Sequence, residues 1–207
     1  HRDLHSFPTR RSSDLTSFFP PPESCRPADV VFVPPLLRAQ VLQIQPTIGD
    51  HVLAYRSHPP SDRFLPFLKR IPHPVVVYGF NLDHRDGNLV FKPRSEDGFL
   101  KDLASCRYVV CSGGHTLMSE ALHLGKPILS FPIGQLFEQY LNGFYLERLG
   151  YGRAFAGYDL DAGVFRGFEA LLDRFRSRIG EGSFCGNEQI FSILDHFIRH
   201  KDLPCAE

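Results

Sequence analysis

The stretch that decides the fold is Val109–Pro132, VVCSGGHTLMSEALHLGKPILSFP. It opens with an apolar run rich in β-branched residues, which Ser112–Gly114 interrupt. Residues 116–124 then show the apolar spacing of a helix, Gly125 suits the helix C-terminus, and residues 128–131 are apolar again. The pattern predicts a strand, a glycine turn, a helix and a second strand, which together form one βαβ unit.

The glycine turn lies at the N-terminus of the predicted helix. Backbone N–H groups there lack partners within the helix, and the helix dipole is positive. Such a turn suits a phosphate group. Two alternatives stay open from these residues alone: the glycines can serve only the turn, and His115 can contact phosphate or act as a capping or packing residue.

Side chains that can hydrogen-bond hydroxyl groups follow this turn. Glu120 lies six residues after Gly114, inside the helix, where a carboxylate can accept two hydrogen bonds from a ribose diol. More such side chains come after the second strand, namely Gln135, Glu138, Gln139 and Asn142. Open α/β sheets bind ligands past the carboxyl ends of their strands, so this cluster predicts a site for a hydroxyl-rich ligand.

The rest of the chain predicts the same architecture. Further strands are expected at His51–Tyr55, Val75–Tyr78, Leu89–Phe91 and Ala154–Ala156. Helices are expected at Asp62–Arg70, Ser95–Ala104, Leu136–Leu149, Val164–Arg178 and Asn187–Arg199. Alternation of this kind predicts an α/β fold with a doubly wound, Rossmann-like parallel sheet.

The run Ser112–Gly152, SGGHTLMSEALHLGKPILSFPIGQLFEQYLNGFYLERLGYG, resembles the donor-binding half of GT-B glycosyltransferases. It is similar to the N-acetylglucosaminyltransferase that makes lipid II and to the UDP-glucuronosyltransferases. It is closer to a less characterised microbial branch that shares the YGFN, FKP, GG and FEQYLN pattern. The resemblance covers roughly residues 49–200. It implies one half of a GT-B fold and a hexosyl- or N-acetylhexosaminyltransferase that uses a nucleotide-diphosphate donor, a UDP-sugar above all.

The resemblance also implies site residues. In these families the glycine turn holds the diphosphate, an acid in the helix binds the ribose, and a pair after the next strand binds the sugar. By matching position, Glu120 is expected to bind the ribose, and the sugar is expected to be bound by Gln135, Glu138 and Gln139. The residues expected to bind the diphosphate are Ser112, Gly113, Gly114, His115 and Thr116. The glucuronosyltransferases carry His in place of Ser112 and Trp in place of His115, so we expect the phosphate contacts to differ.

The resemblance assigns the donor base to Phe91 and Lys92. In the glucuronosyltransferases an aromatic residue here stacks on uracil, and the neighbouring backbone reads the edge of the base. Phe91 can equally be a core residue. Residues 78–81, YGFN, follow a predicted strand, so Gly79 and Asn81 either approach the ligand or form a simple turn.

Composition bounds the remaining possibilities. Lys+Arg and Asp+Glu both number 23, so the chain has no net positive charge that would favour binding to nucleic acid or to an anionic membrane. No apolar run approaches the about 18 residues that a membrane span needs. The cysteines number five without CxxC spacing, which fits reduced cytoplasmic thiols. The histidines form no HxH or HExxH set, so neither a metal nor another cofactor is expected.

Residues 1–15 look foreign to the fold. His5–Leu15, HSFPTRRSSDL, resembles the translation of a widely used sequencing-adapter oligonucleotide, and we expect this non-native segment not to pack. A genuine Ser-rich arm is the alternative. Residues 16–48 are then the end of a missing N-terminal domain, with a strand at Asp29–Val33, and a linker. Residues 49–207 form the donor nucleotide-sugar-binding domain.

The catalytic base and the acceptor site are expected on the missing domain, so we expect this chain alone to be inactive. The acceptor is a glycan, a lipid or a small molecule, and a peripheral contact with the inner face of the membrane through that domain stays open. Two other functions remain as alternatives: a nucleotide-sugar 2-epimerase of the same fold, and a non-catalytic donor-binding subunit.

Overall fold

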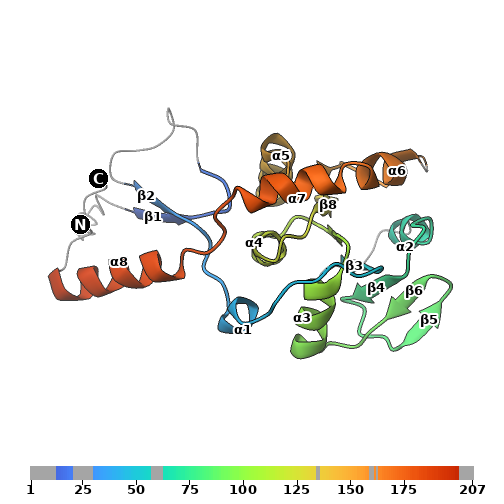
Figure 1. Ribbon diagram of the computed structural model, residues 1–207, viewed down its shortest axis with the longest axis horizontal. Coiled ribbons are helices and arrows are strands. Elements are labelled where there is room, and N and C mark those ends of the chain that lie inside the picture. Colours follow the sequence, from blue (N-terminus) through green and yellow to red (C-terminus); the bar gives the residue numbers. More distant parts are fainter. Residues whose placement is uncertain are drawn as a thin grey trace, which may run out of the picture. The chain divides into compact units, whose positions relative to one another are not determined.

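The computed structural model describes residues 13–20, 30–56, 63–133, 136–158, 161 and 163–200. The chain divides into two compact units. The central unit is Leu37–Phe184, and the terminal unit combines His1–Leu36 with Cys185–Glu207. Most of the regular structure belongs to the central unit (Figure 1).

The central unit contains a seven-stranded sheet with the order β5-β6-β4-β3-β7-β8-β9. All neighbouring strands pair in parallel except β5, which is antiparallel to β6. The predicted doubly wound parallel sheet is therefore confirmed. The strands are β3 (Val52–Tyr55), β4 (Val75–Tyr78), β5 (His84–Asp86), β6 (Leu89–Phe91), β7 (Val109–Cys111), β8 (Ile128–Ser130) and β9 (Gly152–Ala154).

The direction in which strands are added reverses between β3 and β7. From β3 the chain steps outward to β4 and β6, then returns to β7 on the other side of β3 and continues to β8 and β9. Connections that leave two neighbouring strands in opposite directions open a crevice outside the carboxyl ends of those strands. Tyr55 and Cys111 end these two strands and are register partners, so the topology puts the ligand crevice beside them.

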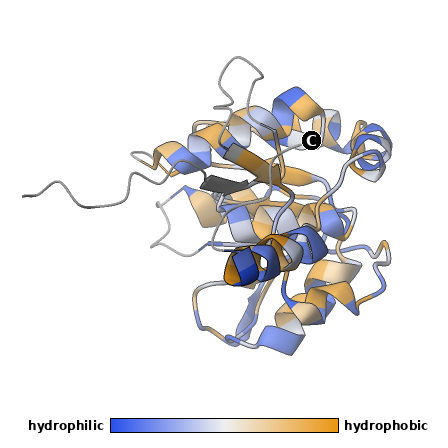
Figure 2. Ribbon diagram, turned by 90° about the vertical axis from the view of Figure 1, so that its left-hand side faces the viewer, coloured by the Kyte–Doolittle hydropathy of each residue, from blue (hydrophilic) through white to orange (hydrophobic). Residues whose placement is uncertain are grey.

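Helices surround this sheet. They are α1 (Ala39–Leu42), α2 (Phe64–Leu68), α3 (Glu96–Ser105), α4 (His115–His123), α5 (Phe137–Leu149), α6 (Gly163–Glu169) and α7 (Leu172–Gly180). In Figure 2 the helices carry both hydrophobic and hydrophilic residues, as expected for helices that cover a sheet and also face solvent. Phe64, Phe67, Phe165 and Phe175 of α2, α6 and α7 share a buried cluster with alternate strand residues such as Val110.

The elements that differ from the sequence predictions include three in the central unit. The exposed, polar strand β5 was missed because it has no apolar alternation, and it pairs through a hairpin in which Gly87 has a φ of +64°. The helix predicted at Val164–Arg178 is two helices, α6 and α7. The last strand begins at Gly152 and not at Ala154, because the glycine lets it lie close against β8.

The terminal unit contains a two-stranded parallel sheet of β1 (Ser13–Thr16) and β2 (Val30–Val33), and the helix α8 (Asn187–His200). The expectation that residues 1–15 do not pack is wrong for Ser13–Leu15, because their backbone pairs with β2. Residues 1–12 lie outside the described residues, and the origin of the segment stays a prediction. Within the described ranges, none of the helices has both the length and the apolar character needed to cross a membrane.

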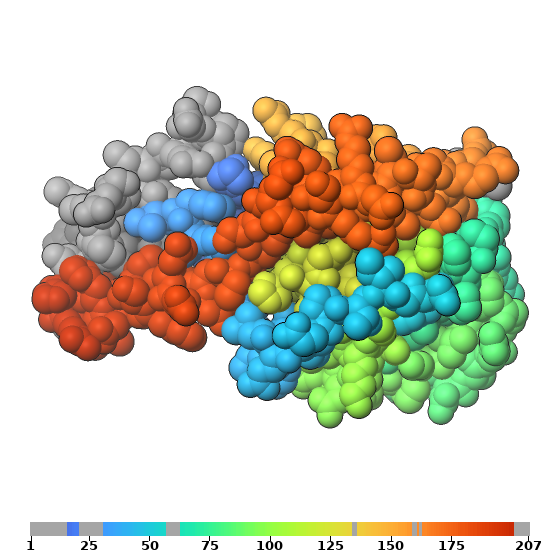
Figure 3. Space-filling model, in the orientation of Figure 1, coloured from blue at the N-terminus to red at the C-terminus, as the bar shows by residue number. Residues whose placement is uncertain are grey.

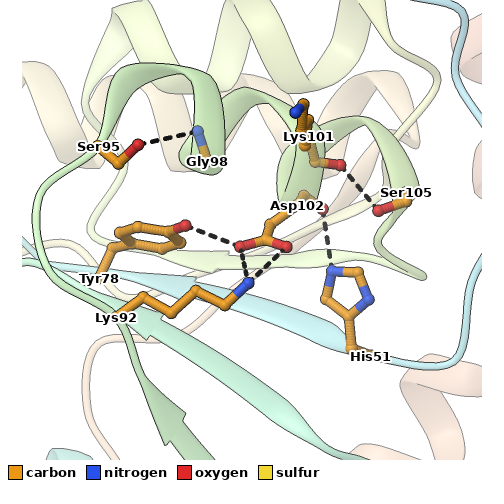
Figure 4. Close-up of polar contacts among 8 residues, drawn as sticks. All are labelled: His51, Tyr78, Lys92, Ser95, Gly98, Lys101, Asp102 and Ser105. Atoms are coloured by element: carbon orange, nitrogen blue, oxygen red, sulfur yellow. Dashed lines mark hydrogen bonds and ion pairs between the residues drawn. The ribbon is translucent and has the colours of Figure 1, made fainter. Parts of the chain in front are cut away.

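A polar network joins the ends of β4 and β6 to α3 (Figure 4). The ammonium of Lys92 lies 3.0 and 2.7 Å from the two carboxylate oxygens of Asp102, and the Tyr78 hydroxyl donates to the same carboxylate at 2.7 Å. Ser95 caps α3 by accepting a hydrogen bond from the Gly98 N–H at 3.1 Å. Burial, followed by the hydrogen bond to Asp102, raises the pKa of Tyr78 well above its usual range, so Tyr78 keeps its proton at neutral pH.

Gly152→Ala is expected to destabilise the protein. The added Cβ would lie 1.9 Å from the carbonyl oxygen of Ile128, so the pairing of β8 with β9 must shift. We expect the free energy of unfolding, measured with urea, to fall by about 1–3 kcal/mol, as in overpacked cores. Gly167→Ala is the matched control, because its Cβ meets nothing within 4 Å and alanine favours helix α6, so stability should rise by about 0.5–1 kcal/mol. Equal effects of the two variants would contradict this account of β9.

Asp102→Asn should also destabilise the protein. It removes the charge that holds Lys92 and replaces one of the two carboxylate oxygens with an NH2 group, so that Lys92 and the Tyr78 hydroxyl must share one neutral acceptor; hydrogen bonds to charged groups contribute about 1.5–3 kcal/mol. Urea unfolding followed by circular dichroism measures the loss. The control is Asp173→Asn, which removes a fully exposed carboxylate in the first turn of α7 that pairs with Arg176. It should change the midpoint only slightly. An unchanged midpoint for Asp102→Asn would mean that the network does not stabilise α3.

Candidate functional site

A cleft of about 1000 Å³ lies at the carboxyl ends of β3, β4 and β7. Its position is the one that the strand order predicts for a ligand site. The side chains and backbone that line it come from the segment before β3, from the strand ends, and from α3, α4 and α5. They are Arg38, Tyr55, Tyr78, Gly79, Asn81, Arg94, Ser95, Glu96, Phe99, Cys111, Ser112, Gly114, His115, Thr116, Leu117, Glu120, Glu138 and Gln139.

The two glycines of the turn have different roles. Gly113 has a φ of +94°, and a Cβ there would approach the Ser130 hydroxyl to 3.0 Å, so the turn itself requires glycine. Gly114 has a φ of −65°, and a Cβ at this position would meet nothing within 4 Å, so its surface is open to the cleft. Glycine at this second position therefore leaves space beside the helix and is not demanded by the turn.

The N-terminus of α4 opens into the cleft without a side-chain cap. Gly114 is the N-cap residue, the first turn contains no acidic residue, and Gly114, Thr116 and Leu117 all line the cleft. The first backbone N–H groups of a helix have no acceptors within the helix, and the dipole is positive there. The arrangement thus offers hydrogen-bond donors and partial positive charge to an anion.

Ser112 and His115 stand on either side of the glycines and also line the cleft. Ser112 is buried and His115 is half-buried. Burial lowers the pKa of His115, while the nearby Glu138 acts in the opposite direction, so the imidazole is mostly neutral at pH 7. A neutral ring can still donate one hydrogen bond to a phosphate oxygen.

Buried amide side chains of α5 bind the glycine turn and the loop after β8. The Asn142 side-chain nitrogen donates to the carbonyl oxygen of Gly113 at 2.9 Å, and the Gln139 side-chain oxygen accepts from the N–H of Ile133 at 3.0 Å. Asn142 is 2 % exposed and is absent from the cleft lining, so it supports the turn from behind. Gln139 and the exposed Glu138 do line the cleft, whereas Gln135 lies outside the described residues.

Glu120 is buried at the edge of the cleft and is bound by an arginine. Its two carboxylate oxygens accept from Nε and Nη2 of Arg38 at 2.6 and 2.8 Å. Nη1 of Arg38 donates to Glu96 at 2.7 Å. The hydrogen bond to Glu120 raises the pKa of Arg38, so this group is always charged. The sequence contains no signal for this pairing, because 82 residues separate the partners and Arg38 lies in a stretch that predicts only a connection.

The residues that the resemblance assigns to the donor base do not line the cleft. Phe91 is 3 % exposed, belongs to the hydrophobic core and is not part of the cleft lining, and the ammonium of Lys92 is bound to Asp102. The aromatic rings in the cleft are those of Tyr55, Tyr78 and Phe99, with Phe99 edge-to-face against both tyrosines at 5.6 and 5.2 Å. Both tyrosines end predicted strands, and this position at the carboxyl end of a strand was the sequence signal that could have placed them in the ligand site.

Gly79 and Asn81 line the cleft, as the ligand interpretation of this turn requires. Gly79 has a φ of +102°, and a Cβ would lie 1.9 Å from the carbonyl oxygen of Arg56, so only glycine fits. Asn81 is non-glycine with a φ of +54°. Across the part of the chain that the structure describes, no group of three or more His, Cys, Asp or Glu side chains could hold a metal ion.

Solved structures share this fold. One is the spinosyn forosaminyltransferase SpnP, with 17% identity and a TM-score of 0.53 over 83% of this chain and 51% of that one. A second is MurG of Acinetobacter baumannii, with 14% identity and a TM-score of 0.56 over 88% of this chain and 60% of that one. Another is Phytolacca americana UGT2 complexed with UDP-2fluoro-glucose and pterostilbene, with 14% identity and a TM-score of 0.52 over 75% of this chain and 42% of that one. The chain spans about half the length of these structures. The expected GT-B-type sheet is confirmed.

Sequence comparisons identify the family. A segment of 45 residues, 22% of this chain, is 51% identical to an uncharacterized glycosyltransferase of Methanosarcina mazei and covers 12% of that protein. The sequence model of Glycosyl transferase family 1 matches residues 5–172. This match covers well over half of the chain, which therefore belongs to Glycosyl transferase family 1.

Proposed function

We propose that this chain is the donor-binding part of a glycosyltransferase that transfers a sugar from a UDP-sugar to an acceptor. The observation that carries the proposal is the uncapped N-terminus of α4, which opens into the cleft where the strand order reverses. Family membership supports sugar transfer in general. The UDP-2fluoro-glucose in the complex of the Phytolacca protein supports UDP as the nucleotide.

In this proposal the diphosphate lies against the first turn of α4. The backbone N–H groups of this turn donate to the phosphate oxygens, together with the side chains of Ser112, His115 and Thr116. When the bond from the sugar to the diphosphate breaks, negative charge grows on the diphosphate. Fixed amides and a helix dipole stabilise that charge without reorganising, so this half needs no metal ion.

The remaining parts of the donor follow from the lining of the cleft. Glu120 accepts from the ribose hydroxyls, and Glu138 and Gln139 bind the hydroxyl groups of the sugar. Gln135 joins this sugar-binding group by its position in the sequence. The partly exposed rings of Tyr55 and Phe99 offer apolar faces to the base, a role that Phe91 cannot fill from the core. The acceptor site and the catalytic base belong to the remainder of a longer cytoplasmic protein.

UDP should bind this chain weakly, with a Kd on the order of 0.1–1 mM, and much more tightly than uridine. The reason is that most of the proposed contacts are made to phosphate, so affinity should rise from uridine to UMP to UDP. Titration followed by NMR measures both affinity and location, with the largest shifts at the amides of Gly113, Gly114 and Thr116. Equal binding of uridine and UDP, or an absence of shifts at millimolar UDP, would contradict the phosphate site.

Gly114→Asp and Gly114→Asn form a matched pair that tests charge at the same place. The two side chains have nearly the same shape, both suit a helix N-cap, and a Cβ at this position meets nothing within 4 Å. Only Asp repels the diphosphate, so its Kd for UDP should exceed that of the Asn variant by about tenfold, equivalent to about 1.4 kcal/mol. Melting temperatures of the two variants serve as the control for folding. Identical affinities would place the diphosphate elsewhere.

A further inference from the structure

Arg38 covers the carboxylate that the proposed function assigns to ribose. Its Nε and Nη2 donate to the two carboxylate oxygens of Glu120 at 2.6 and 2.8 Å. These two parallel bonds take the face of the carboxylate that two neighbouring hydroxyl groups would otherwise use. The Glu120 side chain is only 3 % exposed with Arg38 in place, so a ribose diol does not reach it while the arginine stays.

The release of Glu120 needs only a movement of the Arg38 side chain. This side chain is 38 % exposed and lines the cleft. The chain that follows Arg38 lies on the surface next to α3 and α4 (Figure 3). Thr47 anchors this segment by donating its N–H to the carbonyl oxygen of Ala104 at 2.9 Å. The long side chain of Arg38 can therefore turn while the backbone that carries it stays in place.

A second carboxylate provides the guanidinium with an alternative partner. Nη1 of Arg38 donates to Glu96 at 2.7 Å, and the side chain of Glu96 is 54 % exposed in the first turn of α3. A guanidinium that leaves Glu120 keeps this ion pair and gains contact with water, where arginine heads are well solvated. Opening the pair thus breaks two hydrogen bonds to Glu120, and two ribose hydroxyls replace them.

We propose that Arg38 is an autoinhibitory latch: in the ligand-free protein its guanidinium occupies Glu120, and the ribose of the donor displaces it towards Glu96 and water. The latch rests on the proposed function, because it needs a nucleotide in the cleft. Part of the free energy of ribose binding then offsets the broken ion pair. A diphosphate without a ribose binds the first turn of α4 and leaves the latch closed.

The first test follows the Nε–H resonance of Arg38 by NMR in the whole chain, assigned by its absence from Arg38→Lys. Inorganic pyrophosphate should shift the amides of Gly113 and Gly114 and leave the Arg38 resonance in place. UDP should shift the same amides and also move the Arg38 resonance, or broaden it through faster exchange with water. An Arg38 resonance that moves with pyrophosphate, or stays in place with UDP bound, would overturn the latch while the diphosphate site stands.

The second test compares the Kd of UDP with that of 2′,3′-dideoxy-UDP, which lacks both ribose hydroxyls. Arg38→Met leaves the latch open, so the preference for UDP should rise about tenfold above that of wild type, the effect of two ordinary hydrogen bonds that no longer compete with an ion pair. Arg38→Lys keeps the charge but not the two parallel bonds, so the preference should rise by a smaller factor. This variant tests the latch if Arg38→Met fails to fold.

Arg94→Met is the control for charge. Arg94 lines the same cleft, but Glu120 is bound by Arg38, so the loss of Arg94 should weaken both nucleotides alike and leave their ratio unchanged. An unchanged or smaller ratio in both Arg38 variants would overturn the latch while the proposed function stands. Equal binding of the two nucleotides by wild type and by every variant would overturn the ribose assignment of Glu120 as well. No binding of either nucleotide would overturn the proposed function itself.

Discussion

The parallel pairing of β3 with β7 is the constraint on which the rest of the structure depends. These strands are central in the sheet, yet the chain passes from one to the other only after building β4, β5, β6 and α3. Because the connections leave their carboxyl ends in opposite directions, the space above them stays open among the described residues. The cleft, the glycine turn and the aromatic lining all follow from that gap.

The helix α5 shows how much of the fold serves the glycine turn. Its buried residues include Gln139, Asn142 and Gly143, whereas Phe137 and Phe144 are exposed. An ordinary surface helix buries its apolar side, so this helix is reversed over part of its length. The buried amides satisfy backbone groups of the turn and of the loop after β8, which irregular backbone cannot satisfy alone. This part of α5 therefore contributes less stability from apolar burial, and its buried amides instead hold the glycine turn rigid.

The charges around the cleft follow a similar logic. Two carboxylates, Glu96 and Glu120, share the guanidinium of Arg38, and the more buried of them receives the two parallel bonds. Ion pairs that are buried add little net stability, because desolvation offsets the attraction. Their value lies in fixing geometry, and here the fixed group is a carboxylate at the edge of a cleft with an uncapped helix N-terminus.

The sequence by itself determined the βαβ unit around Gly113 and Gly114 and the parallel doubly wound sheet, because apolar period and glycine placement are local signals that survive without the fold. The family followed from resemblance to known sequences. Tertiary structure alone decided that Phe91 is a core residue, that the polar β5 pairs with β6, and that Arg38 binds Glu120. Each of these depends on contacts between segments far apart along the chain, and a local pattern carries no information about which distant side chain will arrive beside it.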